Sequence, residues 1–152
     1  MLLIFLVGVV SGLRALTAPA VVAWAAHLNW LNLHDSRLAF MGSTAAVVVF
    51  TLLALGELVA DKLPSTPKRT QPPGLIGRIS LGALSGAVVA VSASQSVALG
   101  AVVGAAGGIA GAFAGYQART RLVRALKVPD PVIACVEDAV AIGAGLLLVS
   151  RF

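Results

Sequence analysis

Residues 11–19 read SGLRALTAP and lie inside the first long apolar run of the chain, which covers about residues 2–26. The stretch puts a charged side chain, Arg14, near the middle of a segment that is otherwise apolar. A proline inside a helix removes one backbone hydrogen bond and crowds the preceding turn, so Pro19 predicts a kink or break just beyond Arg14. Broken helices at membrane depth are tolerated where they line a cavity or are buried in protein, so this stretch marks a candidate functional site.

The composition is typical of an integral membrane protein. The chain has 152 residues, of which 59% are hydrophobic and 11% are charged, and its mean hydropathy is +0.97. A soluble domain is about one quarter charged, so this composition excludes a soluble protein. One crossing of a bilayer takes about 20 apolar residues as a helix, so the crossings use nearly the whole chain. We therefore expect a single integral membrane domain, residues 1–152, with no room for a soluble catalytic domain.

Apolar runs separated by polar segments define the expected helices. The second run covers about residues 38–60, and the last covers about residues 131–150. Between them, the stretch of about residues 79–123 is long enough for two crossings at about 1.5 Å rise per residue. We expect it to turn back at its one polar cluster, SASQS, residues 92–96. The sequence therefore predicts an all-α, polytopic membrane helix bundle with about five transmembrane helices, with four and six as the alternatives.

The distribution of Lys and Arg predicts the orientation of the bundle. With five alternating crossings, the segments 61–78 and 119–130 fall on the same side. That side holds Lys62, Lys68, Arg69, Arg78, Arg119, Arg121, Arg124 and Lys127, whereas the other side holds Arg37 and Arg151. Short cytoplasmic loops are enriched in Lys and Arg, so we expect the N-terminus and both basic segments to be cytoplasmic. The formal net charge of +5 then reflects topology, and no nucleic-acid partner is expected.

Small residues recur at spacings of four in the third and fourth expected helices. These positions include Gly82, Gly86, Gly100, Gly104, Gly108, Gly111 and Gly115. Lipid gives helices no hydrophobic drive to associate, so close approach of backbones through small residues is the main route to tight packing. The stripes predict helix contact faces, used either within one chain or also to build a homo-oligomer in the lipid bilayer.

Ionisable residues inside the apolar runs form a candidate polar centre. They are Arg14, Glu57, Asp61, Glu137 and Asp138. An uncompensated charge in the middle of a membrane helix costs about 2.5 to 3.5 kcal/mol on insertion scales, so such groups are normally paired and turned inward. We expect Arg14 to pair with Glu57 or Glu137, because guanidinium and carboxylate match as a bidentate fork. Glu137 and Asp138 are adjacent, so at most one of them is expected to face the same partner, and a carboxylate left over is a candidate proton carrier.

Two functions compete for this centre. The leading hypothesis is a small transport or permeation protein for an ion or a small anionic or lipid-phosphate ligand, with proton linkage as one form of it. The alternative is a structural or assembly subunit in which the charges only lock the bundle and the glycine stripes bind the same protein or a partner complex. Catalysis comes third, because Cys135 is the only cysteine and lies on a different face from Glu137. The two histidines, His27 and His34, flank a loop, so we expect no enzyme, no metal site and no cofactor.

The proline-rich basic segment DKLPSTPKRTQPPGLIGR, residues 61–78, is expected to be a loop, because proline fixes φ and removes backbone donors. It would hold Lys62, Lys68, Arg69 and Arg78 at the cytoplasmic surface. Each such cation is worth about 1 kcal/mol of attraction to an anionic leaflet. The segment is interpreted either as a nonspecific lipid contact or as a gate or headgroup site for an anionic ligand.

The stretches SGLRALTAPAVVAWAA and GELVADKLPSTPKRTQPPGLIGR, with the glycine-rich and acid-bearing helices that follow, resemble a bacterial family of small integral membrane proteins known as domain of unknown function 4126. The resemblance covers almost the whole chain. Its most specific residues are Gly12, Leu13, Arg14 and Pro19, and then Glu57, Asp61, Lys62, Pro64 through Arg69, and Arg78. It implies a multi-pass protein of the bacterial inner membrane, and it brings neither an established activity nor catalytic residues.

Overall fold

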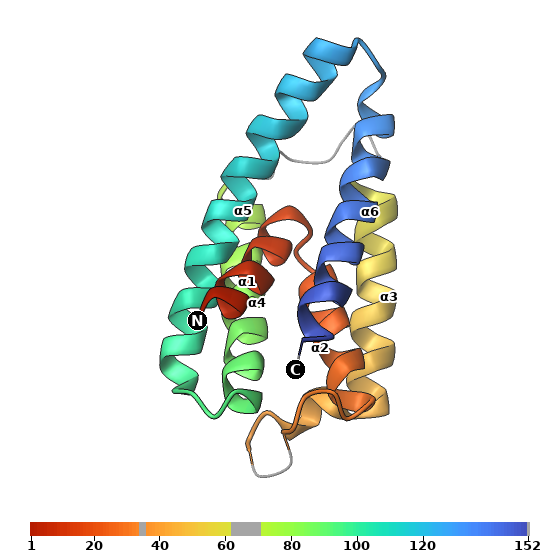
Figure 1. The fold of residues 1–152 in the computed structure, drawn as a ribbon. Coiled ribbons are helices and arrows are strands. Elements are labelled where there is room, and N and C mark those ends of the chain that lie inside the picture. Colours follow the sequence, from red (N-terminus) through yellow and green to blue (C-terminus); the bar gives the residue numbers. More distant parts are fainter. Residues whose placement is uncertain (34–35, 62–70, 152) are drawn as a thin grey trace.

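The computed structural model describes residues 1–33, 36–61 and 71–151. Within these ranges the chain forms six α-helices and one 3₁₀ turn, and no strand (Figure 1). The elements are α1 (Leu2–Leu13), α2 (Thr17–His27), η1 (Ala39–Gly42), α3 (Thr44–Ala60), α4 (Pro72–Ser92), α5 (Val97–Leu126) and α6 (Asp130–Val149). The predicted all-helical fold class is therefore confirmed.

Three of the described helices, α4, α5 and α6, are long and apolar enough to cross a membrane. The α1 and α3 helices are apolar but shorter, with 12 and 17 residues. At about 1.5 Å per residue, α1 is about 18 Å long, well short of the roughly 30 Å hydrocarbon core of a bilayer. The structure thus has helices suited to a membrane protein, but it does not confirm five full spans.

The first apolar run is broken at its charged residue. The α1 helix ends at Leu13, Arg14 is extended with φ −140° and ψ 110°, and α2 begins at Thr17. Pro19 lies in the first turn of α2, where a backbone N–H has no intrahelical partner to lose. The predicted break is confirmed, and it lies before Pro19 because this proline fits the start of a new helix better than the interior of an old one.

The two halves of the broken run point in opposite directions along the bundle (Figure 1). The α1 helix runs parallel to α5, because Gly8 contacts Gly104 and Gly12 contacts Gly108. The α2 helix runs antiparallel to α3, since Leu16 lies near the end of α3 and Ala26 lies at its start. The chain therefore doubles back at Arg14 and does not cross once.

This reversal changes the expected position of the N-terminus relative to the basic segments. The N-terminus lies toward the end of the bundle that holds the α4–α5 turn, whereas the α5–α6 connection lies at the opposite end (Figure 1). The predicted cytoplasmic N-terminus assumes that residues 2–26 cross once, whereas the structure divides this run into α1 and α2.

The predicted glycine stripes form the contacts of α1, α4 and α5. On α4, Gly82 and Gly86 face Gly100 and Gly104 of α5, and a Cβ atom added at any of them would collide with the neighbouring helix. On its other side α5 receives α1, with Gly107, Gly108 and Gly111 against the backbone of α1 or α4, while Gly115 is buried. These faces are thus occupied by helices of the same chain.

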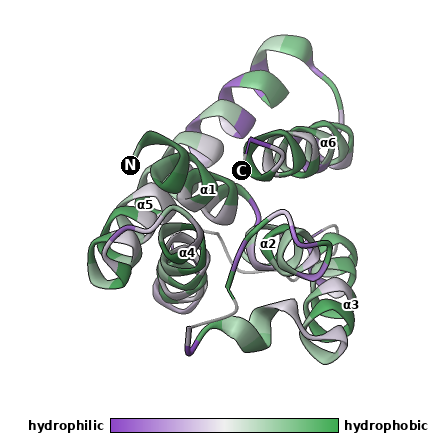
Figure 2. Ribbon diagram, turned by 60° about the horizontal axis from the view of Figure 1, so that its bottom comes forward, coloured by the Kyte–Doolittle hydropathy of each residue, from purple (hydrophilic) through white to green (hydrophobic). Residues whose placement is uncertain are grey.

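The remaining helices, α2, α3 and α6, form a second group beside the first (Figure 2). The α2 helix is its centre, with Ala18, Val22, Ala23 and Ala25 all at most 1% exposed. By contrast, the outer faces of α3 and α6 expose large apolar side chains such as Leu52, Val59, Val136, Val140 and Leu147. Such faces suit contact with lipid.

Candidate functional site

Arg14 lies at the junction of the two helix groups and is 0% exposed. Its Nη1 pairs with Oδ2 of Asp61, at the end of α3, and its Nη2 pairs with Oδ1 of Asp138, in α6. A single guanidinium therefore joins the end of α1 to two other helices. The two carboxylates that were expected to pair with Arg14 also have other neighbours: Glu57 accepts from backbone amides and Glu137 lies near Arg119.

Glu57 binds the backbone of the helix break. Its Oε1 accepts a hydrogen bond from the N–H of Ala15 and its Oε2 accepts one from the N–H of Leu16, both at 2.8 Å. Leu16 is the N-cap of α2, and N–H groups at the start of a helix have no intrahelical acceptor and lie at the positive end of the helix dipole, so they favour an anion. Glu57 supplies that anion to α2 from within the chain.

Arg78 is part of the same centre and does not lie in a surface loop. It belongs to α4, is 5% exposed, and donates from Nε to the carbonyl of Gly12 at 2.9 Å and from Nη1 to the carbonyl of Gly74 at 3.3 Å. Its Nη2 lies 3.7 Å from Oε1 of Glu57. The carbonyl of Arg78 in turn accepts a hydrogen bond from Oγ of Ser11 at 3.2 Å.

The predicted loop over residues 61–78 is thus too long. The α4 helix begins at Pro72, with Pro72 and Pro73 in its first turn, where proline is tolerated. Both prolines were expected to break a helix, which would place Arg78 at the surface as a contact for an anionic ligand or lipid, but the burial of Arg78 does not fit that role. The other predicted contacts, Lys62, Lys68 and Arg69, lie outside the described residues.

A second group of charges connects this centre to the surface. Arg119, in α5, donates from Nε to Oδ1 of Asp130 at 2.7 Å, and its Nη2 pairs with Oδ2 of the same carboxylate. Its Nη1 lies 3.9 Å from Oε2 of Glu137. Glu137 and Asp138 thus face different arginines, as their adjacency predicts. The sequence analysis missed Asp130, although it lies seven residues before Glu137 and so on the same face of α6.

Side-chain exposure falls along these charges toward Arg14. It is 56% for Asp130, 17% for Arg119 and 11% for Glu137. It then drops to 10% for Asp138 and 0% for Arg14. We call the whole set the charged network; its members are Arg14, Glu57, Asp61, Arg78, Arg119, Asp130, Glu137 and Asp138.

The described part of the charged network holds most of the carboxylates of the chain. The chain has six Asp and Glu residues, and five of them belong to the network; the sixth, Asp35, lies outside the described residues. Five carboxylates and three guanidinium groups of the described residues belong to the network, whereas Lys62, Lys68 and Arg69, which follow Asp61 in the chain, lie outside the described residues. Among the described residues no group of three or more His, Cys, Asp or Glu side chains is arranged to hold a metal ion.

No curated protein and no solved structure matches this chain. The expected family is the one that matches, and it does so over residues 1–150, from the start of α1 to the end of α6. The chain therefore belongs to the family described as Domain of unknown function (DUF4126).

Proposed function

We propose that the protein is a small membrane permeation protein and that the ion it passes is the proton. One observation carries the proposal: five of the six carboxylates of the chain gather, with three arginines, around a helix break. A carboxylate can take up and release a proton, so a network with five carboxylates suits a proton better than the anionic or lipid-phosphate ligand that the sequence allows. A proton also needs only one carboxylate at a time, whereas a metal ion needs several.

The cost of burying charge supports a functional role. Ionisable groups in a membrane protein are expensive, and a buried ion pair seldom stabilises a fold more than well-packed apolar residues do. The contacts of α5 with α1 and α4 are made by glycine, so the chain has another way to join helices. The charges that join α1, α3 and α6 then call for a reason beyond packing.

The network also suggests a route for the proton. Asp130 is more than half exposed, Glu137 and Asp138 follow along α6, and Asp138 shares Arg14 with Asp61. In this proposal a proton enters at Asp130 and passes inward to the break.

A structural lock is the second candidate, and a specific observation favours it. Arg14 is fully buried and paired with two carboxylates, as expected of a residue that fixes helix positions. In that case the network would have no path through it, and the protein would act as an assembly subunit.

The proposal keeps the bacterial inner membrane and a cytoplasmic position for the basic α5–α6 end, in line with the excess of Lys and Arg there. Because the chain reverses between α1 and α2, the proposal places the N-terminus at the end of the bundle opposite the α5–α6 connection. It includes no catalytic residue, cofactor or nucleic-acid partner. A homo-oligomer also stays in the proposal, and it would form through faces other than the occupied glycine faces of α4 and α5.

Proton flux into liposomes separates the two candidates. Purified protein is reconstituted with a pH-sensitive dye inside the vesicles, and flux is driven by a potassium diffusion potential. We expect acidification above that of empty vesicles, lowered about tenfold or more in Asp138→Asn, which removes an ionisable carrier from the route. Arg124→Gln, an exposed change on α5, should leave the flux unchanged.

A matched stability measurement makes either outcome informative. Circular dichroism should find Asp138→Asn helical under the flux conditions, so that lost flux reports the carrier and not the fold. Wild-type flux equal to that of empty vesicles, together with a large loss of stability in Asp138→Asn, would reject permeation and favour the lock.

A further inference from the structure

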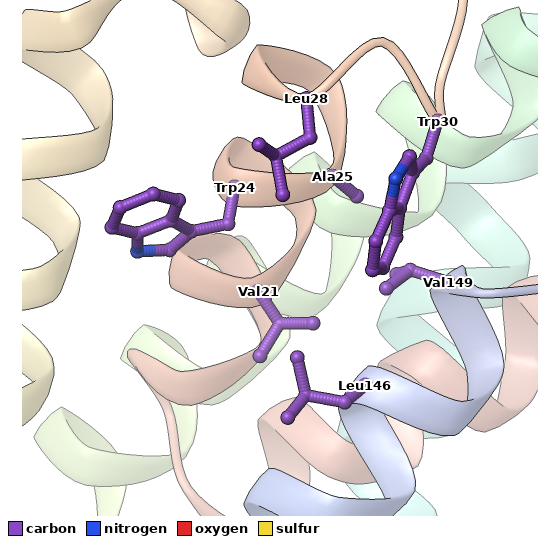
Figure 3. Close-up of a pocket in the computed structure, with 7 residues that line it drawn as sticks. All are labelled: Val21, Trp24, Ala25, Leu28, Trp30, Leu146 and Val149. Atoms are coloured by element: carbon purple, nitrogen blue, oxygen red, sulfur yellow. The ribbon is translucent and has the colours of Figure 1, made fainter.

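A second candidate site lies far from the charged network, in a groove between α2 and α6 (Figure 3). The groove has a volume of about 290 Å³. It is lined entirely by apolar side chains: Val21, Trp24, Ala25, Leu28, Trp30, Leu146 and Val149. Trp24 and Trp30 are the two tryptophans of the chain. The groove therefore offers apolar contact and no charged group to hold a polar ligand.

The position of the groove fits the boundary between lipid tails and headgroups. It lies where α2 and α6 both end, away from the basic α5–α6 connection (Figure 1). Trp is enriched at this boundary because its ring is apolar and its N–H is polar. The Nε1–H of Trp24 donates to Oγ1 of Thr51 in α3 at 3.0 Å, which fixes the ring beside the groove. Trp24, Trp30 and Leu146 are each between 43% and 46% exposed, so the groove is open on its outer side.

A cation follows the groove in the chain. The α6 helix ends at Val149, whose side chain is 1% exposed and lines the groove, and Arg151 comes two residues later and is exposed. An apolar groove with a cation at its end matches an anionic phospholipid, which has an apolar chain joined to a phosphate. A soluble peptide would need acceptors and donors that the groove lining lacks.

We propose that this groove binds one acyl chain of an anionic phospholipid and that Arg151 holds the phosphate of the headgroup. The site lies at the opposite end of the bundle from the basic segments that the sequence assigned to lipid contact. It does not depend on proton permeation, and it would exist equally in a structural subunit.

The chain carries its own reporter for this site, because both tryptophans line the groove. Bromine on a lipid tail quenches the fluorescence of an indole that it touches. The protein is reconstituted in phosphatidylcholine that contains a small fixed fraction of either brominated phosphatidylglycerol or brominated phosphatidylcholine. We expect the anionic lipid to quench with an apparent association about fivefold stronger, the effect of one cation near a lipid phosphate. Trp24→Phe and Trp30→Phe each leave one indole, so the two variants show which tryptophan is quenched.

Two variants separate the site from ordinary contact with surrounding lipid. Arg151→Gln should remove the preference for the anionic lipid, and it should leave the fold intact because Arg151 is exposed. Leu146→Ser should weaken quenching by both lipids, whereas Leu147→Ser, next to it on α6 and 65% exposed but outside the groove, should not.

Three results would overturn the proposal. Equal quenching by the two brominated lipids would show that the headgroup is not recognised. Equal behaviour of Leu146→Ser and Leu147→Ser would show that the acyl chain does not bind in the groove. Quenching that falls as the protein-to-lipid ratio rises would assign the groove to a second copy of the chain.

Discussion

The contacts within the first helix group differ from the contacts that join it to the second group. The α5 helix meets α1 and α4 through glycine, backbone against backbone with no room for a Cβ atom, and Arg78 of α4 adds a hydrogen bond to the carbonyl of Gly12 in α1. The α1, α3 and α6 helices are joined instead by long charged side chains that converge on Arg14. Both arrangements avoid the need for a hydrophobic drive, which lipid does not supply.

The difference indicates which part of the molecule can change shape. A glycine contact depends on short backbone separations, and any sliding of one helix along the other replaces contact with collision. A charged side chain can exchange one carboxylate for another within its reach. Any change of conformation should therefore move α2, α3 and α6 against a fixed α1–α4–α5 group, with the break after Arg14 as the joint.

The largest predicted effect is that of Arg14→Gln. The change leaves the carboxylates of Asp61 and Asp138 buried without their guanidinium, and breaking a buried pair in this way costs about 3 to 5 kcal/mol. Unfolding in mixed micelles of increasing dodecyl sulfate content measures the loss. Adding Asp138→Asn to Arg14→Gln should recover part of it, because one uncompensated charge is removed.

Arg124→Gln is the control, since an exposed arginine on α5 should change the free energy of unfolding by no more than about 0.5 kcal/mol. Equal effects of Arg14→Gln and Arg124→Gln would mean that the charged network does not stabilise the contact between the two helix groups.

One methyl group added at the glycine contact should lower the free energy of unfolding nearly as much as Arg14→Gln does. A Cβ atom at Gly104 would meet the backbone of Gly82 and Gly86, so Gly104→Ala forces α4 away from α5 and costs about 3 kcal/mol. The same unfolding titration measures it. Gly56→Ala in α3 is the matched control, because nothing lies within 4 Å of a Cβ atom there. If both variants unfolded alike, the close approach of α4 and α5 would not matter to stability.

Much of this comparison could be predicted from the sequence. The predicted helix break is confirmed beside Arg14, and the structure places glycines of α4 and α5 in helix contacts and acids of α3 and α6 near Arg14. These features follow from local rules, such as the spacing of four along a helix and the cost of isolated charge in lipid.

The partners of the charges could not be predicted, because they depend on how α1 and α2 are arranged. An apolar run has the same sequence pattern whether it crosses the membrane once or doubles back. Only the reversal presents the amides of Ala15 and Leu16 to Glu57, which leaves Arg14 to the two aspartates. Likewise, Pro72 and Pro73 resemble a loop unless the helix start is known, so the burial of Arg78 was missed.

A smaller effect is predicted for Glu57→Gln. The amide keeps one acceptor oxygen, so one of the two backbone N–H groups at the start of α2 loses its charged partner, at a cost of about 1 to 3 kcal/mol. Hydrogen exchange should find the amides of Ala15 and Leu16 less protected, while Gly104 and its neighbours on α5 keep their protection. Uniform loss of protection across both helix groups would show that the break is not a separate joint.

The smallest effect is expected at Gly143, in α6, where an added Cβ atom would meet nothing within 4 Å. Alanine favours a helix over glycine by up to about 1 kcal/mol in water, but a chain unfolded in a membrane keeps much of its helix, so Gly143→Ala should stabilise by about 0.5 kcal/mol or less. The dodecyl sulfate titration, repeated at several protein concentrations, measures the change. A loss of stability would mean that another surface covers Gly143. If the loss grew with protein concentration, that surface would belong to a second copy of the chain. Gly143 would then be a contact between two molecules, whereas the glycines of α5 are contacts within one molecule.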